Sequence, residues 1–372
     1  MSTPQVFQFS HTPVHSHCFS QDRQTLAITK ETEVEIYNVS NPSKPQLIAV
    51  LKDHDKTVTA VDISIHGRIV TCSQDRNAIV WEPLSDGTYK PTLVLLRINR
   101  SATSVKWAPN GFKFAVGSSA RVIAVCYFEQ ENDWWISKHI KKPIRSTILS
   151  IEWHPNNILL AAGSSDGHAR VFSGFIKGID NKPSGASLWG EKFPFNTLCG
   201  DFISSCGGWV HDVAFSPSGD VLAFVAHDST VTVVYPNGGE GVAPKSILSV
   251  STSHLPFTSV FFADENTLVA AGHNRFPVVF QGDETEWLEV HSIDDPKKSV
   301  AQGSTETTAL NMFKQLDLKG AVQTGASSSS SSLNTIHQNT ITQLRPYAFG
   351  SKGEVTKFSS SGIDGKVVIF DI

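Results

Sequence analysis

Seven short apolar segments recur along the 372-residue chain at a spacing of about 45 residues. Each ends on an aromatic or apolar residue, and these closing residues are Tyr37, Trp81, Cys126, Phe172, Val234, Phe280 and Phe370. The successive gaps between them are 44, 45, 46, 62, 46 and 90 residues. Strand-like segments at such a period are typical of a β-propeller with four-stranded blades. We therefore predict an all-β chain that forms one propeller over residues 1–372.

The local pattern supports strands joined by tight turns. Apolar and polar residues alternate over 149–153, which is the period of a half-buried strand. A proline-containing turn follows the strand that ends at Trp107, Trp153 or Phe215. Proline presets φ at the first corner of such a turn, and Asn or Gly tolerates the positive φ that follows.

The second repeat carries four polar and aromatic residues that match the structural tetrad of the WD repeat. They are His54, Thr71, Asp75 and Trp81. Buried polar groups need partners, and this set supplies them to one another. An alternative is that His54 and Asp75 are half of a catalytic triad. The fourth and seventh repeats are expected to keep only the turn aspartate, and the first, third and sixth repeats lack it.

Two gaps exceed the period and indicate insertions. The 62-residue gap places one insertion between Gly174 and Gly208, in the outer part of the fourth blade. The 90-residue gap has room for an eighth blade, but residues 294–336 show no alternating strand and include six consecutive serines at 327–332. We predict seven blades and a flexible inserted loop over 294–336. A strand within residues 4–10 should close the ring as the fourth strand of the last blade.

Composition excludes several classes of function. The net charge of −4 argues against a nucleic-acid binder, and no apolar run reaches the length of a membrane span. Five scattered cysteines and the lack of an N-terminal signal peptide indicate a reducing compartment. No phosphate-binding loop, nucleophile elbow or zinc-protease motif is present, so we expect no catalytic residues, no cofactor and no enzyme. His11, His15 and His17 could hold a metal, but a strand-end surface explains them better, and we expect no metal site.

One block of sequence is more distinctive than the repeat. It spans residues 127–135 and 138–147, is preceded by 90–94 and 97–100, and is followed by 153–157. Together with residues 206–211 and 227–231, this block closely resembles the WD-repeat subunit of the actin-related protein 2/3 complex. The resemblance implies a non-catalytic scaffold subunit that supports the nucleation of branched actin filaments.

The resemblance also implies partners and a location. The partners would be the other subunits of the complex, the actin filament and a nucleation-promoting factor, in the cytoplasmic actin cytoskeleton near the cell cortex. Two other readings remain open, a generic WD-repeat adaptor such as a ubiquitin-ligase substrate receptor and a propeller enzyme. The enzyme would need acids, bases or metal ligands that converge in the central channel, and none is evident in the sequence.

A basic stretch is the first candidate contact site. Between Lys90 and Arg145 there are ten Lys or Arg residues and three Asp or Glu residues, a balance of +7. A local basic field steers acidic partners. The candidate partner-binding residues are Arg97, Arg100, Lys138, Lys141, Lys142 and Arg145. The alternatives are a solvated rim, in which each charge contributes little, or a site for anionic lipid or nucleic acid.

The long insertion contains the second candidate. Residues 305–319 lack proline and glycine, and apolar residues at helical spacing would line one face, namely Ala309, Met312, Phe313 and Leu316 with Leu310 beside them. We predict a short helix that docks into a partner's groove. The alternative is that it packs on its own propeller. The family resemblance implies that this insertion reaches actin or the activating factor.

Overall fold

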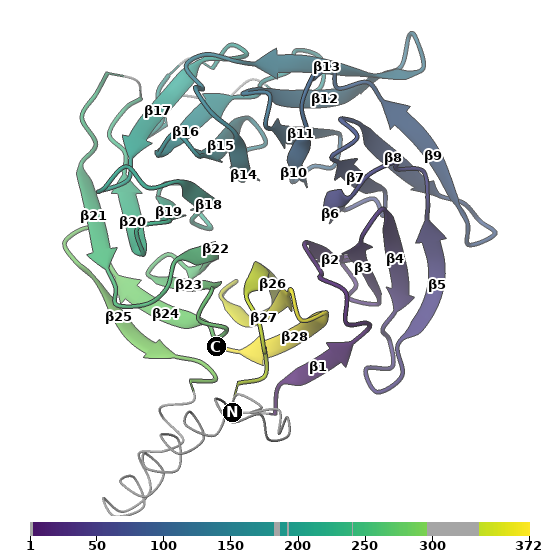
Figure 1. The fold of residues 1–372 in the computed structure, drawn as a ribbon. Helices are drawn as coiled ribbons and strands as arrows, with labels where there is room; N and C mark the ends of the chain where they lie inside the picture. The colour runs from purple at the N-terminus through teal and green to yellow at the C-terminus, as the bar shows by residue number, and fades with distance from the viewer. Residues whose placement is uncertain (1–2, 182–186, 192, 240, 296–334) are drawn as a thin grey trace, which may run out of the picture.

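The computed structural model describes residues 3–181, 187–191, 193–239, 241–295 and 335–372. Seven antiparallel four-stranded sheets form a ring around a central axis (Figure 1). This arrangement confirms the prediction of an all-β, seven-bladed propeller. The described residues contain no helix, and so none that could cross a membrane. The predicted helix over 305–319, with its five apolar residues, lies outside the described residues.

The first four blades follow chain order from the innermost strand outward. Blade 1 is β2 (His17–Phe19), β3 (Thr25–Lys30), β4 (Glu33–Asn38) and β5 (Gln46–Leu51). Blade 2 is β6 (Val58–Ile63), β7 (Ile69–Ser73), β8 (Ala78–Pro83) and β9 (Tyr89–Val94). Blade 3 is β10 (Ala102–Trp107), β11 (Lys113–Ser118), β12 (Ile123–Glu129) and β13 (Trp134–Ile140). Blade 4 is β14 (Ile148–Trp153), β15 (Leu159–Ser164), β16 (His168–Ser173) and β17 (Leu198–Ile203).

The remaining blades complete the ring. Blade 5 is β18 (Val210–Phe215), β19 (Leu222–Ala226), β20 (Thr230–Tyr235) and β21 (Ser246–Ser251). Blade 6 is β22 (Phe257–Asp264), β23 (Thr267–Gly272), β24 (Val278–Gly282) and β25 (Trp287–Ser292). Blade 7 is β26 (Ile341–Phe349), β27 (Val355–Gly362) and β28 (Lys366–Asp371), with β1 (Gln5–Gln8) from the other end of the chain as its outer strand.

The seven closing residues hold the same place in every blade. Each lies on the third strand and pairs with an apolar residue of the second strand, as in Trp81 with Ile69 and Phe370 with Phe358. All of them except Tyr37, which is half-buried, are buried between adjacent sheets. The sequence period therefore reflects one packing position that recurs in each blade.

The two ends of the chain meet in blade 7. β1 pairs with β28 in antiparallel register, from Gln5 opposite Ile369 to Gln8 opposite Lys366. Phe7 is buried in a cluster that also contains Val14, Leu26 and Val367, and it joins blade 7 to blade 1. A ring closed in this way leaves no unpaired strand at the junction.

Threonine hydroxyls tie several neighbouring blades together. Thr59 Oγ1 donates to the carbonyl of Ala102 (3.1 Å), and Thr103 Oγ1 donates to that of Ile148 (2.6 Å). The same bond recurs from Thr258 to Ile341 (2.5 Å) and from Thr342 to Val14 (2.7 Å). These four threonines occupy one position of the innermost strand, which places a polar bond at the seam between blades.

The insertion in blade 4 runs from the end of β16 to the start of β17, over residues 174–197. Its Trp189 and Phe193 pack into a core cluster with Phe202 and Phe215, so these residues of the insertion belong to the folded body. The longer gap in the repeat separates β25 from β26 and adds no further blade among the described residues.

Candidate interaction surfaces

The tetrad of blade 2 is a closed hydrogen-bonded set. His54 Nδ1 lies 2.7 Å from an Asp75 carboxylate oxygen, and His54 Nε2 lies 2.8 Å from Thr71 Oγ1. Trp81 Nε1 donates to the same hydroxyl at 3.0 Å. The His54 and Asp75 side chains are only 2% and 7% exposed. The set joins the loop before the blade to its inner turn, which is a structural role. Both ring nitrogens of His54 have a partner within the set.

A second set of this kind lies in blade 7, where we expected the turn aspartate alone. His337 Nδ1 is 3.1 Å from Asp364 Oδ1, and its Nε2 is 2.7 Å from Ser360 Oγ. The His337 ring also lies 6.4 Å from that of Phe370. The prediction was wrong for two reasons. Serine and phenylalanine stand where the tetrad of blade 2 has threonine and tryptophan. The long insertion before His337 also removes the regular spacing from the preceding blade by which this histidine would be recognised.

The six predicted basic residues lie close together on blade 3 and the connections beside it. Lys138 is on β13, Arg97 and Arg100 precede β10, and the other three lie between β13 and β14. The Arg97 guanidinium donates to the Ser137 carbonyl, and His139 Nε2 donates to the Leu96 carbonyl at 2.8 Å. These bonds fix the 95–101 loop against β13. We call this group the basic surface, made of Arg97, Arg100, Lys138, Lys141, Lys142 and Arg145.

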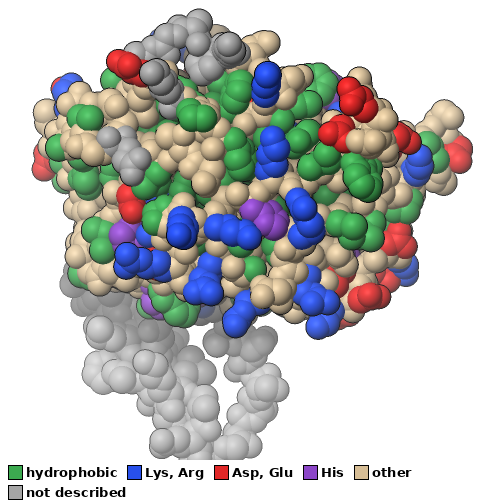
Figure 2. Space-filling model, turned by 90° about the horizontal axis from the view of Figure 1, so that it is seen from above, with side chains coloured by type: hydrophobic (Ala, Val, Ile, Leu, Met, Phe, Trp, Pro, Cys, Tyr) green, Lys and Arg blue, Asp and Glu red, His purple; other side chains and the backbone are tan. Residues whose placement is uncertain are grey.

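The basic surface is exposed and uncompensated. All six side chains are exposed, and within the described part of the chain none of them forms an ion pair. Figure 2 shows Lys and Arg side chains gathered in a band on one side of the molecule, with apolar side chains beside them. Leu95 is 63% exposed in the loop that carries Arg97, and Trp134 is 58% exposed at the other end of β13 while Trp135 is buried.

Two of the ten cations counted in the sequence do not belong to the surface. Lys106 forms an ion pair with Glu152 at 2.8 Å inside the central channel. Lys113 is fully buried against Asp180 of the blade 4 insertion, and burial lowers the pKa of its ammonium group to about 8. The structure therefore reduces the exposed cations of the stretch from ten to eight, and six of these make up the basic surface.

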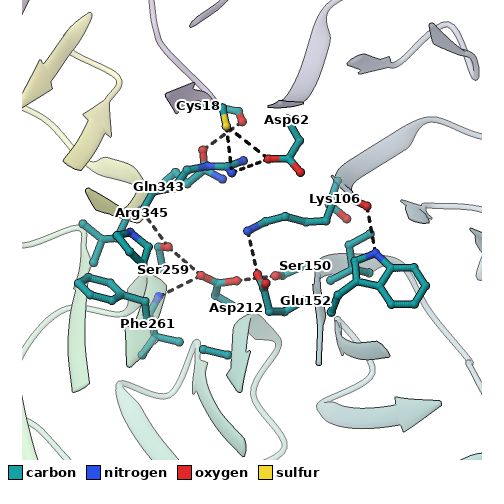
Figure 3. A pocket seen from close by; sticks show the side chains of 18 of the residues that line it. Cys18, Asp62, Lys106, Ser150, Glu152, Asp212, Ser259, Phe261, Gln343 and Arg345 are labelled. Carbon is teal, nitrogen blue, oxygen red and sulfur yellow. Dashed lines mark hydrogen bonds and ion pairs between the residues drawn. The ribbon is translucent and has the colours of Figure 1, made fainter. Parts of the chain in front are cut away.

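The central channel encloses a cavity of about 600 Å³ lined by the innermost strands (Figure 3). Arg345 of β26 forms an ion pair with Asp62 of β6 at 2.6 Å and donates to the Val61 carbonyl at 3.0 Å. The Trp107 backbone N–H donates to the other Asp62 oxygen at 2.7 Å. Asp62 thus connects blades 7, 2 and 3.

Asp212 plays the same part on the opposite wall of the channel. It accepts hydrogen bonds from the hydroxyls of Ser150 and Ser259, the latter at 2.7 Å, and from the Val260 backbone N–H at 2.9 Å. Burial raises the pKa of Asp212. Asp212 therefore joins blades 4, 5 and 6, as Figure 3 shows. The residues that line the channel were not identified from the sequence. A signal was present, because Cys18, Asp62, Lys106 and Glu152 recur at nearly the repeat period on the innermost strands and all line the cavity.

The three N-terminal histidines do not come together as one group of ligands. His17 is buried, and its Nε2 lies 2.8 Å from Ser359 Oγ. His11 and His15 are exposed, and His15 lies at the cavity wall.

The chain is similar to known proteins over its whole length. The family model "WD domain, G-beta repeat" matches residues 45–82 and 137–173. "Actin-related protein 2/3 complex subunit 1" of Saccharomyces cerevisiae is 52% identical over 99% of this chain and 97% of its own length. The protein of the same name from Schizosaccharomyces pombe is 48% identical, with both chains fully covered. "Actin-related protein 2/3 complex subunit 1A-A" of Xenopus laevis is 47% identical over 98% of this chain and 96% of its own.

Proposed function

Since this chain belongs to the family of actin-related protein 2/3 complex subunit 1, we propose that it is a non-catalytic scaffold subunit of that complex. In this role it supports the nucleation of branched actin filaments by holding other subunits in place. The location that follows is the cytoplasmic actin cytoskeleton, near the cell cortex. A rigid closed ring suits a scaffold, because its loops and outer strands are held in fixed positions.

The arrangement of the polar groups supports a non-catalytic role. Catalysis by acids and bases requires titratable groups that are free to reach a substrate. In the channel, Asp62 and Asp212 already accept several protein donors each, and Glu152 is paired with Lys106. In blade 2, His54 and Asp75 are enclosed by their own tetrad. These polar groups join strands and blades.

The basic surface is the observation that carries the proposal of partner binding. Six exposed cations without a carboxylate partner repel one another, and an acidic partner relieves that repulsion. The loop that bears Arg97 is fixed to β13 by two hydrogen bonds, so the charges are presented in a defined geometry. Leu95 adds an exposed apolar contact beside them. We infer that an acidic surface of another subunit docks here.

Charge reversal tests this role. Lys141→Glu, Lys142→Glu and Arg145→Glu together should weaken incorporation into the complex, and the deficit relative to the wild type should be largest at low ionic strength, because salt screens the charge interactions that the reversal alters. The measurement is the amount of partner subunits that co-purifies with the tagged protein over a series of salt concentrations. The matched control reverses three exposed lysines elsewhere, Lys44, Lys56 and Lys352. Equal co-purification of the wild type and the triple variant at physiological salt would refute this role for the basic surface.

The actin filament and the nucleation-promoting factor are proposed as further partners, bound by the predicted helix over 305–319 through Ala309, Leu310, Met312, Phe313 and Leu316. The competing function is a generic WD-repeat adaptor. Mass spectrometry of the native complex separates the two, since recovery of ubiquitin-ligase subunits without actin-related proteins would favour the adaptor.

A further inference from the structure

The charge of this chain is divided between two parts of the ring that lie on either side of blade 4. Residues 201–295, which include blades 5 and 6, contain thirteen Asp or Glu residues and two cations, Lys245 and Arg275, a balance of −11. The stretch from Lys90 to Arg145 carries +7, so the rest of the chain sums to zero within the net charge of −4. Lys106 and Lys113 are paired inside the protein, so the surface of the basic stretch carries eight cations against three carboxylates. A modest total charge therefore conceals two local fields of opposite sign.

The outer strands of blades 5 and 6 form an apolar face within the acidic part. β21 and β25 are the edge strands of their sheets and contact each other (Figure 1). Ile247 on β21 is 47% exposed, and Leu288 and Val290 on β25 are 55% and 52% exposed. An edge strand presents unpaired backbone groups, and exposed apolar side chains on it favour pairing with another chain.

Carboxylates surround this face. Asp283, Glu284, Glu286 and Glu289 all lie on β25 or the turn that leads into it, and all four are exposed. Lys245 forms an ion pair with Glu284, and His254 Nε2 lies 2.9 Å from Glu289. One lysine against four carboxylates leaves the face with an excess of negative charge. We call it the acidic outer face, made of Ile247, Asp283, Glu284, Glu286, Leu288, Glu289 and Val290.

We propose that the acidic outer face binds an extended segment of another protein that is rich in lysine or arginine and carries apolar side chains between the charges. The edge of β25 accepts an extended chain as an added strand, in which alternate side chains face the surface. Basic side chains complement the four carboxylates, and apolar ones cover Leu288 and Val290. This contact lies on a surface separate from the one proposed to bind an acidic subunit.

Binding of a simple basic peptide to the full-length protein tests the proposal. The probe is a fluorescein-labelled short peptide that alternates lysine and valine, followed by fluorescence anisotropy, and a peptide that alternates glutamate and valine is the control. We expect the basic peptide to bind and the acidic one not to bind. Glu286→Lys with Glu289→Lys should weaken binding about tenfold or more. Leu288→Ser with Val290→Ser should weaken it by about the same factor through lost apolar contact.

A matched control excludes a mere change in net charge. Asp53→Lys with Asp86→Lys reverses two exposed carboxylates on blade 2 and should leave the affinity unchanged. Because the altered side chains of the acidic outer face are exposed, thermal melting should be unchanged in the face variants, and Glu286→Gln alone provides a milder test if a double variant fails to fold.

Four outcomes would overturn the proposal. One is equal affinity in the wild type and the face variants, and another is an equal loss in the blade 2 control. The third is a serine variant that binds as well as the wild type, since the peptide would then sense charge alone. Dimers of the free protein in sedimentation, lost on Leu288→Ser with Val290→Ser, would assign the face to a second copy of the chain and would also refute the proposed occupant.

Discussion

Closure of the ring by β1 should account for a measurable part of the stability, and Phe7 is the residue through which to test it. Phe7 is 2% exposed, while its neighbour Val6 is 44% exposed on the opposite face of the strand. The Phe7 ring stacks on Phe9 at 5.7 Å between centroids, and Phe9 lies 4.2 Å from the ring of Tyr37 in blade 1. Loss of Phe7 therefore removes contacts that hold blades 7 and 1 together.

The magnitude follows from the burial of this side chain. A buried Phe→Ala change costs about 3–5 kcal/mol, because the lost transfer free energy is joined by the cavity left behind. An unfolding entropy of about 2.1 cal/mol/K per residue gives about 0.8 kcal/mol/K for this chain, so Phe7→Ala should lower Tm by about 4–6 °C. Val6→Ala should cost less than about 1 kcal/mol, because nearly half of its side chain is already in water.

Thermal melting and urea unfolding of the wild type, Phe7→Ala and Val6→Ala provide the measurement. Deletion of residues 1–10 should destabilise at least as much as Phe7→Ala and should also promote association, because it exposes the edge of β28. A deletion variant that melts within about 2 °C of the intact protein would refute the closure argument. Equal effects of Phe7→Ala and Val6→Ala would show that the burial is not what stabilises the junction.

Three other predictions follow from the same structure. His54→Ala should lower the free energy of unfolding by about 1–3 kcal/mol, since it removes one hydrogen bond from the buried Asp75 carboxylate and one from the buried Thr71 hydroxyl, as urea unfolding would show. Burial lowers the pKa of His154 to about 4 from its usual 6.5, so the unfolded chain takes up a proton first as the pH falls. The contribution of His154 to stability is therefore complete above about pH 6.5, and it falls by about 2 kcal/mol between pH 7 and pH 5. Urea unfolding midpoints should show this drop in the free energy of unfolding, and His154→Gln should reduce it. Met312→Asp with Phe313→Asp should slow branch formation in a pyrene-actin assay while melting and co-purification stay unchanged; reduced melting would indicate a helix packed on its own propeller, and no change in either would indicate a simple linker.

The fold was predictable because one packing position repeats. The closing residues mark the third strand of each blade, and their apolar character is required by burial between adjacent sheets. Seven such marks, with no alternating strand over residues 294–336 of the longest gap, were sufficient to count the blades. A pattern of this kind survives the decay of individual motifs, because each blade needs the buried residue even when it lacks the tetrad.

Polar contacts between blades were harder to predict. The tetrad of blade 7 has Ser360 and Phe370 in place of threonine and tryptophan. The two hydrogen bonds of the histidine are kept, whereas the bond of the tryptophan is replaced by a ring contact, so the sequence motif is not recognisable. Lys106 and Lys113 contributed to the charge balance of +7 counted in the sequence, yet each is paired with a carboxylate on a distant segment. Sequence spacing reports which strand a residue belongs to, whereas its partner is decided by how neighbouring blades pack.

The division of charge around the ring connects the fold to its use as a scaffold. In a flexible chain, motion would average the charge of +7 over residues 90–145 with that of −11 over residues 201–295. Salt would also screen both charges within a Debye length of about 8–10 Å. Here closure by β1 holds blade 3 and blades 5 and 6 at fixed positions, so the two fields stay separate and point in different directions. A partner with one sign of charge is then favoured at one surface and repelled at the other, which selects an orientation before any apolar contact forms. A change that loosens the ring, such as Phe7→Ala, should therefore weaken orientation of partners as well as stability, while charge reversal at either surface should affect partners and leave stability unchanged.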